Sequence, residues 1–151
     1  MSLMDIWMRD MTSFGGLSVI GLIFLFLLAL DKMTIALEFL LAVVLSQIVI
    51  FGIRFFYFRA RPGRTRRKFK NLYERLDESS FPSIHAARAG IIAIVLAQGL
   101  PFLAKILLWI TATLICFSRY YLKRHHATDL LVGGILGLII GYIVIIVGGL
   151  I

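Results

Sequence analysis

The sequence predicts an all-α integral membrane protein: a helical bundle of about five transmembrane helices with an N-terminal interfacial helix. Of the 151 residues, 60% are hydrophobic and only 16% are charged, whereas about a quarter of the residues in a soluble domain are charged. The mean hydropathy is +0.96. No polar stretch is long enough for a separate soluble domain, so we expect residues 1–151 to form a single membrane-embedded domain.

Five apolar runs are long enough to be candidate spans, because a helix needs about 20 residues to cross the hydrocarbon and irregular backbone is not tolerated there. They cover approximately residues 12–30, 33–58, 82–99, 101–117 and 130–151. A tight turn at Asp31 and Lys32 joins the first two. In the fifth, Gly133, Gly137 and Gly141 recur every four residues, so one face of this helix should allow a neighbouring helix to approach closely.

Residues 1–11 are too short and too charged to span a membrane. Apolar side chains such as Trp7 and Met8 could instead line one side of a helix that lies at the membrane interface. With five crossings, segments 59–81 and 118–128 are on the same side as the N-terminus. Two segments distant in the sequence are therefore expected to meet at one membrane surface.

Arg54 and Arg61 form the first of three polar clusters on this face. They are seven residues apart, or two helical turns, so their guanidinium groups should project from one side of the end of the second span. Pro62 then stops the helix. Guanidinium groups suit phosphate oxygens, although arginines at a helix end also contact lipid headgroups.

The second cluster opens the third span with Pro82, Ser83, Ile84 and His85. Proline at the first helical position leaves the following amides without intrahelical partners, and the helix dipole adds to their positive potential. The residues therefore predict an anion site, to which Ser83 offers a hydroxyl. His85 can change protonation near neutral pH and is a candidate general acid or base, although a histidine at an interface can also be merely amphipathic.

The third cluster contains Arg119, His125, His126 and Asp129. Asp129 follows His125 by four residues and His126 by three, so its carboxylate could reach either imidazole and fix the tautomer. Local geometry does not separate the two histidines, and a purely structural His–Asp pair is an alternative. Arginines, a helix-end anion site and a His–Asp pair on one face together suggest phosphate as their shared ligand.

These residues resemble the pattern of the type 2 phosphatidic acid phosphatases, a family of integral membrane lipid phosphate phosphatases. The family pattern is Lys, six residues and Arg-Pro; then Pro-Ser-Gly-His; then Ser-Arg, five residues, His, three residues and Asp. The matching positions here are Arg54, Arg61-Pro62, Pro82-Ser83-Ile84-His85, Ser118-Arg119, His125 and Asp129. The resemblance selects His125 over His126.

Two positions depart from the family pattern. Arg54 stands where the family usually has lysine, and this replacement keeps the positive charge at the position. Ile84 stands where the family has glycine. This replacement keeps the backbone amide, but the isoleucine side chain crowds the pocket. The resemblance also implies a six-helix core, of which this chain is expected to lack the first helix.

The resemblance implies that His125 attacks phosphorus to form a phosphohistidine, that Asp129 orients it, and that His85 protonates the leaving group and later activates water. The phosphate oxygens would be held by Arg54, Arg61, Ser83, the Ile84 amide and Arg119. We expect no cofactor or metal, because the eight acidic residues include no intramembrane carboxylate cluster that could hold magnesium.

The predicted function is therefore a metal-independent phosphatase for a lipid phosphate or diphosphate, with polyprenyl diphosphate, phosphatidic acid and phosphatidylglycerophosphate all open. One alternative is a phosphotransferase of the same fold that passes the phosphate to a lipid or sugar hydroxyl. Another is a non-catalytic membrane subunit that binds anionic lipids. The expected partners are the lipid substrate and membrane lipids, and not nucleic acid.

Two further sets of positive charge lie near these clusters. Arg88, three residues after His85, has a predicted accessory role: it either contacts substrate or pairs with an acidic residue, Asp77, Glu78 or Asp129. A basic run in the loop is expected to bind lipid headgroups. It comprises Arg64, Arg66, Arg67, Lys68 and Lys70.

The charge distribution and the resemblance disagree about orientation. All 16 Lys and Arg residues except Lys32 and Lys105 lie on the face of the three clusters, and the positive-inside rule places such a face in the cytoplasm. The resemblance implies the reverse, because bacterial and archaeal members usually place their sites outside. We expect a cell-membrane protein with an extracytoplasmic site.

Overall fold

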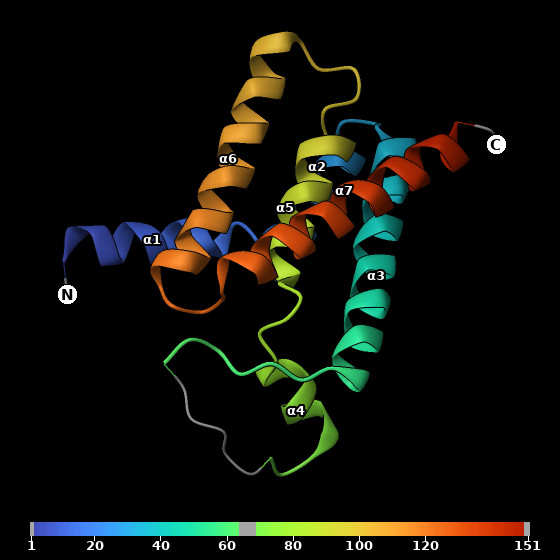
Figure 1. Cartoon of the computed structure of the whole chain (residues 1–151). Helices are drawn as coiled ribbons and strands as arrows, with labels where there is room; N and C mark the ends of the chain where they lie inside the picture. The colour runs from blue at the N-terminus through green and yellow to red at the C-terminus, as the bar shows by residue number, and fades with distance from the viewer. Residues whose placement is uncertain (1, 64–68, 150–151) are drawn as a thin grey trace.

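The computed structural model describes residues 2–63 and 69–149, and its regular structure over those ranges is entirely helical. Figure 1 shows the helices in chain order. They are α1 (Leu3–Ser13), α2 (Leu17–Ala29), α3 (Met33–Phe56), α4 (Leu72–Glu78), α5 (Ile84–Val95), α6 (Phe102–Tyr121) and α7 (Ala127–Gly148). The predicted all-α class is confirmed.

Helices α3, α6 and α7 are each long and apolar enough to cross a membrane. Helices α1 and α2 pass the same test only as a pair, which is bent by 51°. The first span was expected to run unbroken from Thr12 to Leu30, and the break falls at Gly15 and Gly16 instead. Gly16 has an extended backbone and caps α2. In Figure 1, α1 lies crosswise to α6, against which it packs.

The third expected span is shorter than predicted. Helix α5 has 12 residues, about 18 Å at 1.5 Å per residue, against a hydrocarbon thickness of about 30 Å. It begins after Ser83, whose side chain caps it by accepting a hydrogen bond from the Ala86 amide. After its end, Gly99 turns the chain with a φ of +67°, and Pro101 caps α6.

Helix α5 packs most extensively against α7, and glycines make this close approach possible. A Cβ atom at Gly133 would collide with the carbonyl oxygen of Ser83, just before α5, and one at Gly137 with a backbone carbonyl oxygen of α5. One at Gly141 would meet side chains of α5. The predicted close packing along this face of the last helix is therefore confirmed.

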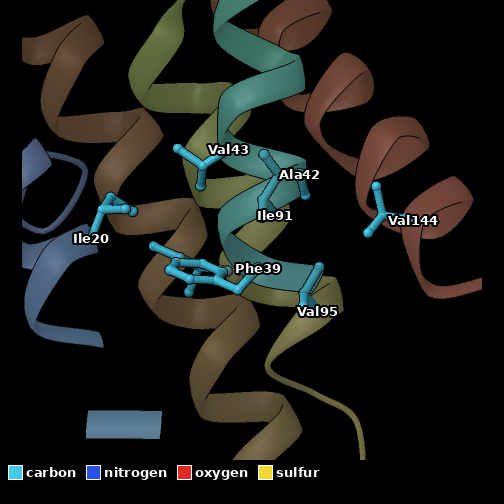
Figure 2. Packing of buried hydrophobic residues seen from close by; sticks show 8 residues of the cluster. Ile20, Phe39, Ala42, Val43, Ile91, Val95 and Val144 are labelled. Atoms are coloured by element: carbon cyan, nitrogen blue, oxygen red, sulfur yellow. The ribbon is translucent and has the colours of Figure 1, made fainter. Parts of the chain in front are cut away.

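The main hydrophobic core surrounds α5 and joins it to α2, α3 and α7. Figure 2 shows these side chains gathered between the helices. The buried members are Ile20, Phe39, Ala42, Val43, Ile91, Ile92, Val95 and Val144. A second cluster of Ala89, Ala93, Ala112 and Ile115 joins α5 to α6. Because α5 is enclosed by its neighbours, its first turn is held in a fixed position between the ends of α3 and α6.

Candidate active site

One cavity lies where the end of α3, the start of α5, the end of α6 and the α6–α7 connection converge. In Figure 1, the segment that contains α4 and the α6–α7 connection lie at the same end of the bundle, away from the α5–α6 connection. The cavity has a volume of about 270 Å³. It is lined by Gly16, Leu17, Gln47, Phe51, Arg54, Arg61, Tyr73, Asp77, Ile84, His85, Arg88, Arg119 and His125.

Arg54 is held in the cavity wall by two backbone carbonyl groups. Its Nη1 donates to the Leu76 oxygen at 2.9 Å and its Nη2 to the Pro82 oxygen at 2.8 Å, and the residue is only 2% exposed. These bonds tie the end of α3 to α4 and to the start of α5. Because both partners are uncharged, the positive charge of the guanidinium stays available to an anion.

Arg61 and Arg119 approach the same cavity from two other segments. Arg61 donates from Nη2 to the Asp77 carbonyl oxygen at 2.8 Å. Arg119 donates from Nη1 to the Thr12 hydroxyl at 3.0 Å, and its Nη2 lies 3.5 Å from Nε2 of His125. The structure thus brings together the three arginines that the sequence singled out. Three guanidinium groups around one cavity favour a multiply charged oxyanion such as phosphate.

The imidazole of His125 is oriented by a backbone carbonyl. Its Nδ1 lies 2.7 Å from the Ser80 oxygen, and because a carbonyl oxygen only accepts, Nδ1 carries the proton. The lone pair is then on Nε2, the atom nearest to Arg119. The residue is 3% exposed. The ring nitrogen that can act as a nucleophile therefore faces the arginine-lined cavity.

His125 lies in the connection between α6 and α7, and its surroundings disfavour the imidazolium. Burial is the main cause and the charge of Arg119 the next, and together they lower the pKa of His125 from 6.5 to about 3, although the hydrogen bond to Ser80 acts in the opposite direction. The imidazole is therefore neutral, and able to attack, well below neutral pH.

Asp129 does not make the expected hydrogen bond to His125. Its Oδ2 is 4.0 Å from Nδ1 of His125 and accepts instead from the His126 amide at 2.8 Å, while its Oδ1 accepts from Nη1 of Arg59 at 2.7 Å. The reason is local: Asp129 is in the first turn of α7, where a carboxylate bonds the preceding free amide. It remains close enough to stabilise a positive charge on His125.

Arg59 is a site residue that the sequence analysis did not identify. Besides Asp129, its Nη1 bonds the Thr128 hydroxyl at 2.7 Å, so it joins the segment after α3 to the start of α7. Arginine is frequent in this stretch of the chain, and no spacing rule links position 59 to a carboxylate 70 residues later. The pairing follows from the fold alone.

His85 lines the cavity from the first turn of α5 and packs against the backbone of Gly15. A Cβ atom at Gly15 would lie 2.9 Å from the His85 ring, so the glycine at the bend between α1 and α2 leaves room for this imidazole. His85 and His125 thus line one cavity, as the sequence predicted for a pair of catalytic groups.

The predicted anion site at the start of α5 is only partly realised. Ile84 lines the cavity. Ser83, which is fully buried, does not line it: its hydroxyl accepts from the Ala86 amide at 3.4 Å, and its own amide donates to the Asp129 carbonyl at 3.0 Å. In this structure the Ser83 side chain therefore caps α5.

Arg88 and His126 have backbone partners. Arg88 lines the cavity and donates from Nη1 to the Gly15 carbonyl at 3.0 Å, rather than to one of the three acidic residues considered for it. The His126 ring lies 3.3 Å from the Ala60 carbonyl and is not part of the cavity that holds the arginines. The structure thus places His125, and not His126, beside them.

The positive run in the loop lies largely outside the described residues, which include only Lys70 of its members. Within residues 2–63 and 69–149, no three His, Cys, Asp or Glu side chains come together in a way that could hold a metal ion.

Comparison with known proteins gives one family and two similar structures. The chain matches the PAP2 superfamily over residues 35–149, which include every predicted site residue. It is similar to LpxE of Aquifex aeolicus, with 28% identity and a TM-score of 0.82 over 96% of this chain and 87% of that one. It is also similar to a transmembrane PAP2-type phosphatidylglycerolphosphate phosphatase from Bacillus subtilis, with 26% identity and a TM-score of 0.73 over 95% of this chain and 76% of that one.

The lowered pKa of His125 predicts how its protonation depends on pH. Between pH 6.5 and about 3, the unfolded chain binds a proton at this imidazole that the folded chain does not. The neutral ring's contribution to stability is therefore present above pH 6.5 and lost as the pH falls towards 3. In ¹⁵N NMR spectra of the histidine-labelled protein, we expect His125 to stay neutral, with the proton on Nδ1, from pH 8 down to pH 5.

A charge variant tests the cause of this shift. Arg119→Gln removes the nearest positive charge and should move the pKa of His125 up, towards 6.5. Lys105→Gln, which changes an exposed charge near the start of α6, is the matched control and should leave the titration unchanged. A His125 that titrates near pH 6.5 in the unaltered protein would contradict the burial seen here.

Proposed function

The chain belongs to the PAP2 superfamily, and from this premise we propose that it hydrolyses a lipid phosphate or diphosphate through a phosphohistidine on His125. Its apolar helices and its membrane relative make it an integral membrane protein with a phosphatase fold. The observation that carries the proposal is the position of Nε2 of His125 beside Arg119 in a cavity lined by four arginines.

The first half of the reaction transfers the phosphoryl group to the protein. Nε2 of His125 attacks phosphorus in line, a P–N bond forms, and the P–O bond to the lipid breaks. His85, which takes up a proton when the negative charge of the bound phosphate offsets the surrounding arginines, gives this proton to the departing oxygen. The charge that spreads over the equatorial oxygens meets Arg54, Arg61 and Arg119. The Ser80 carbonyl keeps the ring in position for this attack.

The second half releases inorganic phosphate. His85, now neutral, takes a proton from a water molecule that attacks phosphorus from the side the lipid has left. The P–N bond breaks and His125 recovers its neutral form. The phosphorylated ring carries a positive charge, and the Asp129 carboxylate, 4.0 Å from Nδ1, is the group that would stabilise it.

An apolar groove beside the site supports a lipid substrate. It has a volume of about 490 Å³ and lies between α6 and α7, with small residues of α5 as its floor. Figure 1 shows α6 and α7 diverging from their short connection, with α5 between them. The groove shares Phe117, Tyr120 and Ala127 with a second cavity, of about 710 Å³, that His125 also lines.

The length of this groove suits one lipid chain. Along α7 it extends from Ala127 to Leu138, about 17 Å at 1.5 Å per residue, which is on the order of half the hydrocarbon thickness of about 30 Å. A lipid could therefore enter sideways between the helices, with its chain in the groove and its phosphate at His125. Polyprenyl diphosphate, phosphatidic acid and phosphatidylglycerophosphate are all members of the proposed substrate class.

Removing the nucleophile tests the reaction. In detergent, with a chelator present and no added acceptor, we expect release of inorganic phosphate from at least one member of a lipid phosphate panel. His125→Ala should lower kcat/KM by at least about 10³-fold, because nothing replaces the attacking nitrogen. His126→Ala, one residue along, is the matched control and should stay active. Each variant should elute as the unaltered protein does in gel filtration.

The same assay separates the alternatives. Undiminished turnover by His125→Ala would falsify the phosphohistidine mechanism. Phosphate release that requires an added lipid or sugar alcohol would indicate a phosphotransferase instead. Turnover abolished by the chelator would contradict a metal-independent reaction, and a complete absence of turnover across the panel would favour a non-catalytic lipid-binding subunit.

Filling the groove tests the route of the lipid chain. A Cβ atom at Gly134 meets no atom within 4 Å although the residue lines the groove, so Gly134→Phe should place a ring in the groove without disturbing the packing. We expect kcat/KM for a phosphate ester with a 16-carbon chain to fall about tenfold, as the loss of a few buried methylene groups implies. A four-carbon ester should be hydrolysed as before.

Gly21→Phe is the matched control for this variant, because a Cβ atom at Gly21 also meets nothing within 4 Å and the residue lies on α2, outside the groove. It should leave both esters unaffected. Equal effects of Gly134→Phe on the long and the short ester would show that the chain does not use the groove.

We infer that the protein lies in the cell membrane with this cavity outside the cytoplasm. A phosphate site needs positive charge wherever it faces, so the arginines that line the cavity do not by themselves require a cytoplasmic location. A cysteine introduced at Lys70 in a Cys116→Ser background should react with a membrane-impermeant maleimide added to intact cells. Labelling only after the cells are permeabilised would reverse the assignment.

A further inference from the structure

The cavity continues past the arginines to a polar side chain on α3 that the reaction does not use. Gln47, Phe51 and Arg54 are spaced four and three residues apart, so they form one stripe along the helix, and all three line the cavity. Gln47 is about 10 Å from Arg54 along the helix axis at 1.5 Å per residue. A substrate whose phosphate meets Arg54 would therefore present its adjacent atoms towards Gln47.

Among the described residues that line this cavity, two polar side chains outside the arginine cluster of Arg54, Arg61 and Arg119 have an atom without a partner. The side-chain oxygen of Gln47 is buried and accepts no hydrogen bond from any described residue. Arg88, on α5, uses Nη1 to bond the Gly15 carbonyl, while its buried Nε likewise has no partner among the described residues. The buried Nε atoms of Arg54 and Arg119 also have no partner among the described residues, but these two arginines belong to the candidate phosphate site. Outside that site the cavity thus offers one unused acceptor, on Gln47, and one unused donor, on Arg88.

Buried polar groups without partners are costly and rare in folded proteins. A hydroxyl group is the simplest ligand that can pair with either kind of atom, because it donates one hydrogen bond and accepts others. A hydrocarbon in the same position would leave both atoms unsatisfied, and a site built in this way discriminates against it. The cavity also has space for such a group: of its volume of about 270 Å³, the four oxygens of a phosphate would fill about 120 Å³ at about 30 Å³ each.

We propose that Gln47 and Arg88 form a second subsite that binds a hydroxyl group on the phosphorylated part of the substrate. The protein then prefers phosphate esters of a polyol, such as glycerol or a sugar, over phosphate esters of a simple alkyl or prenyl alcohol. This inference rests on the proposed function and narrows its substrate class. Gln47 is then a specificity-determining residue that contacts the substrate.

A matched pair of substrates tests the subsite. The first is 1-O-hexadecylglycerol 3-phosphate, which has a free hydroxyl on carbon 2, and the second is the same compound without that hydroxyl. We expect the unaltered protein to release phosphate from the first with a kcat/KM about tenfold higher, the effect of roughly one buried hydrogen bond. Gln47→Leu should bring the ratio close to one, because it lowers kcat/KM for the first compound more than for the second.

Ser46→Ala is the matched control. Ser46 is the neighbouring buried polar residue, but its hydroxyl donates to the Val43 carbonyl of its own helix at 2.7 Å and does not line the cavity. This variant should keep the preference for the hydroxyl. Thermal unfolding of the ligand-free protein gives a second readout: Gln47→Leu removes an unpartnered polar group and should keep or raise Tm, whereas the loss of a structural contact would lower it.

The outcomes separate this inference from the function on which it rests. Phosphate release with equal kcat/KM for the two compounds in the unaltered protein, or an unchanged ratio in Gln47→Leu, would overturn the subsite and leave the phosphatase in place. A water molecule that already satisfies Gln47 would give this result. Failure to release phosphate from any lipid would overturn both. If Gln47→Leu does not fold, Gln47→Met makes the same test with a side chain of nearly equal length.

Discussion

The site depends on holding positive charge inside an apolar bundle. Arg54 is almost fully buried, and the carbonyl groups of Leu76 and Pro82 satisfy part of its guanidinium without neutralising it. A buried charge is costly unless polar groups surround it, so the fold has to bring the end of α3, the helix α4 and the start of α5 together at one point. The contacts that stabilise the buried charge of Arg54 also form the wall of the cavity.

A hydrogen bond to a backbone carbonyl sets the tautomer and the orientation of the candidate nucleophile. With Nδ1 of His125 on the Ser80 carbonyl, the lone pair on Nε2 is directed to the arginines, and no side-chain carboxylate is needed to choose the tautomer. Asp129 is left to cap α7 and to bind Arg59. In the proposed reaction its charge matters most when the ring becomes positive, since at 4.0 Å in a buried setting it would favour the phosphorylated imidazolium over the free imidazole.

The apolar surroundings of the cavity follow from the short central helix. Because α5 is enclosed by its neighbours and reaches only part of the way across the bundle, polar residues at its first turn lie beneath the surface, between helices that are themselves apolar outside. The splayed arrangement of α6 and α7 then leaves a groove open to lipid next to these residues. The candidate phosphate site and the proposed place for the lipid chain are thus two consequences of how α5 is packed.

The sequence by itself determined the all-helical membrane class, from hydropathy, and the face of α7 that packs closely against α5, from the spacing of its glycines. It also predicted, from the parity of crossings, that Arg54, Arg61, His85, Arg119 and His125 gather on one side of the bundle. These are local or additive properties of the chain. The sequence did not determine the length of α5, the bend at Gly15 and Gly16, or the partners of Asp129 and Ser83. Those depend on competition between nearby groups. Asp129 could pair with the His125 ring, with a helix amide three residues away or with an arginine 70 residues away, and only the folded arrangement decides that it binds the last two. The role we propose for Gln47 depends on tertiary structure in the same way, because an amide in an apolar run reveals nothing until the groups around it are known.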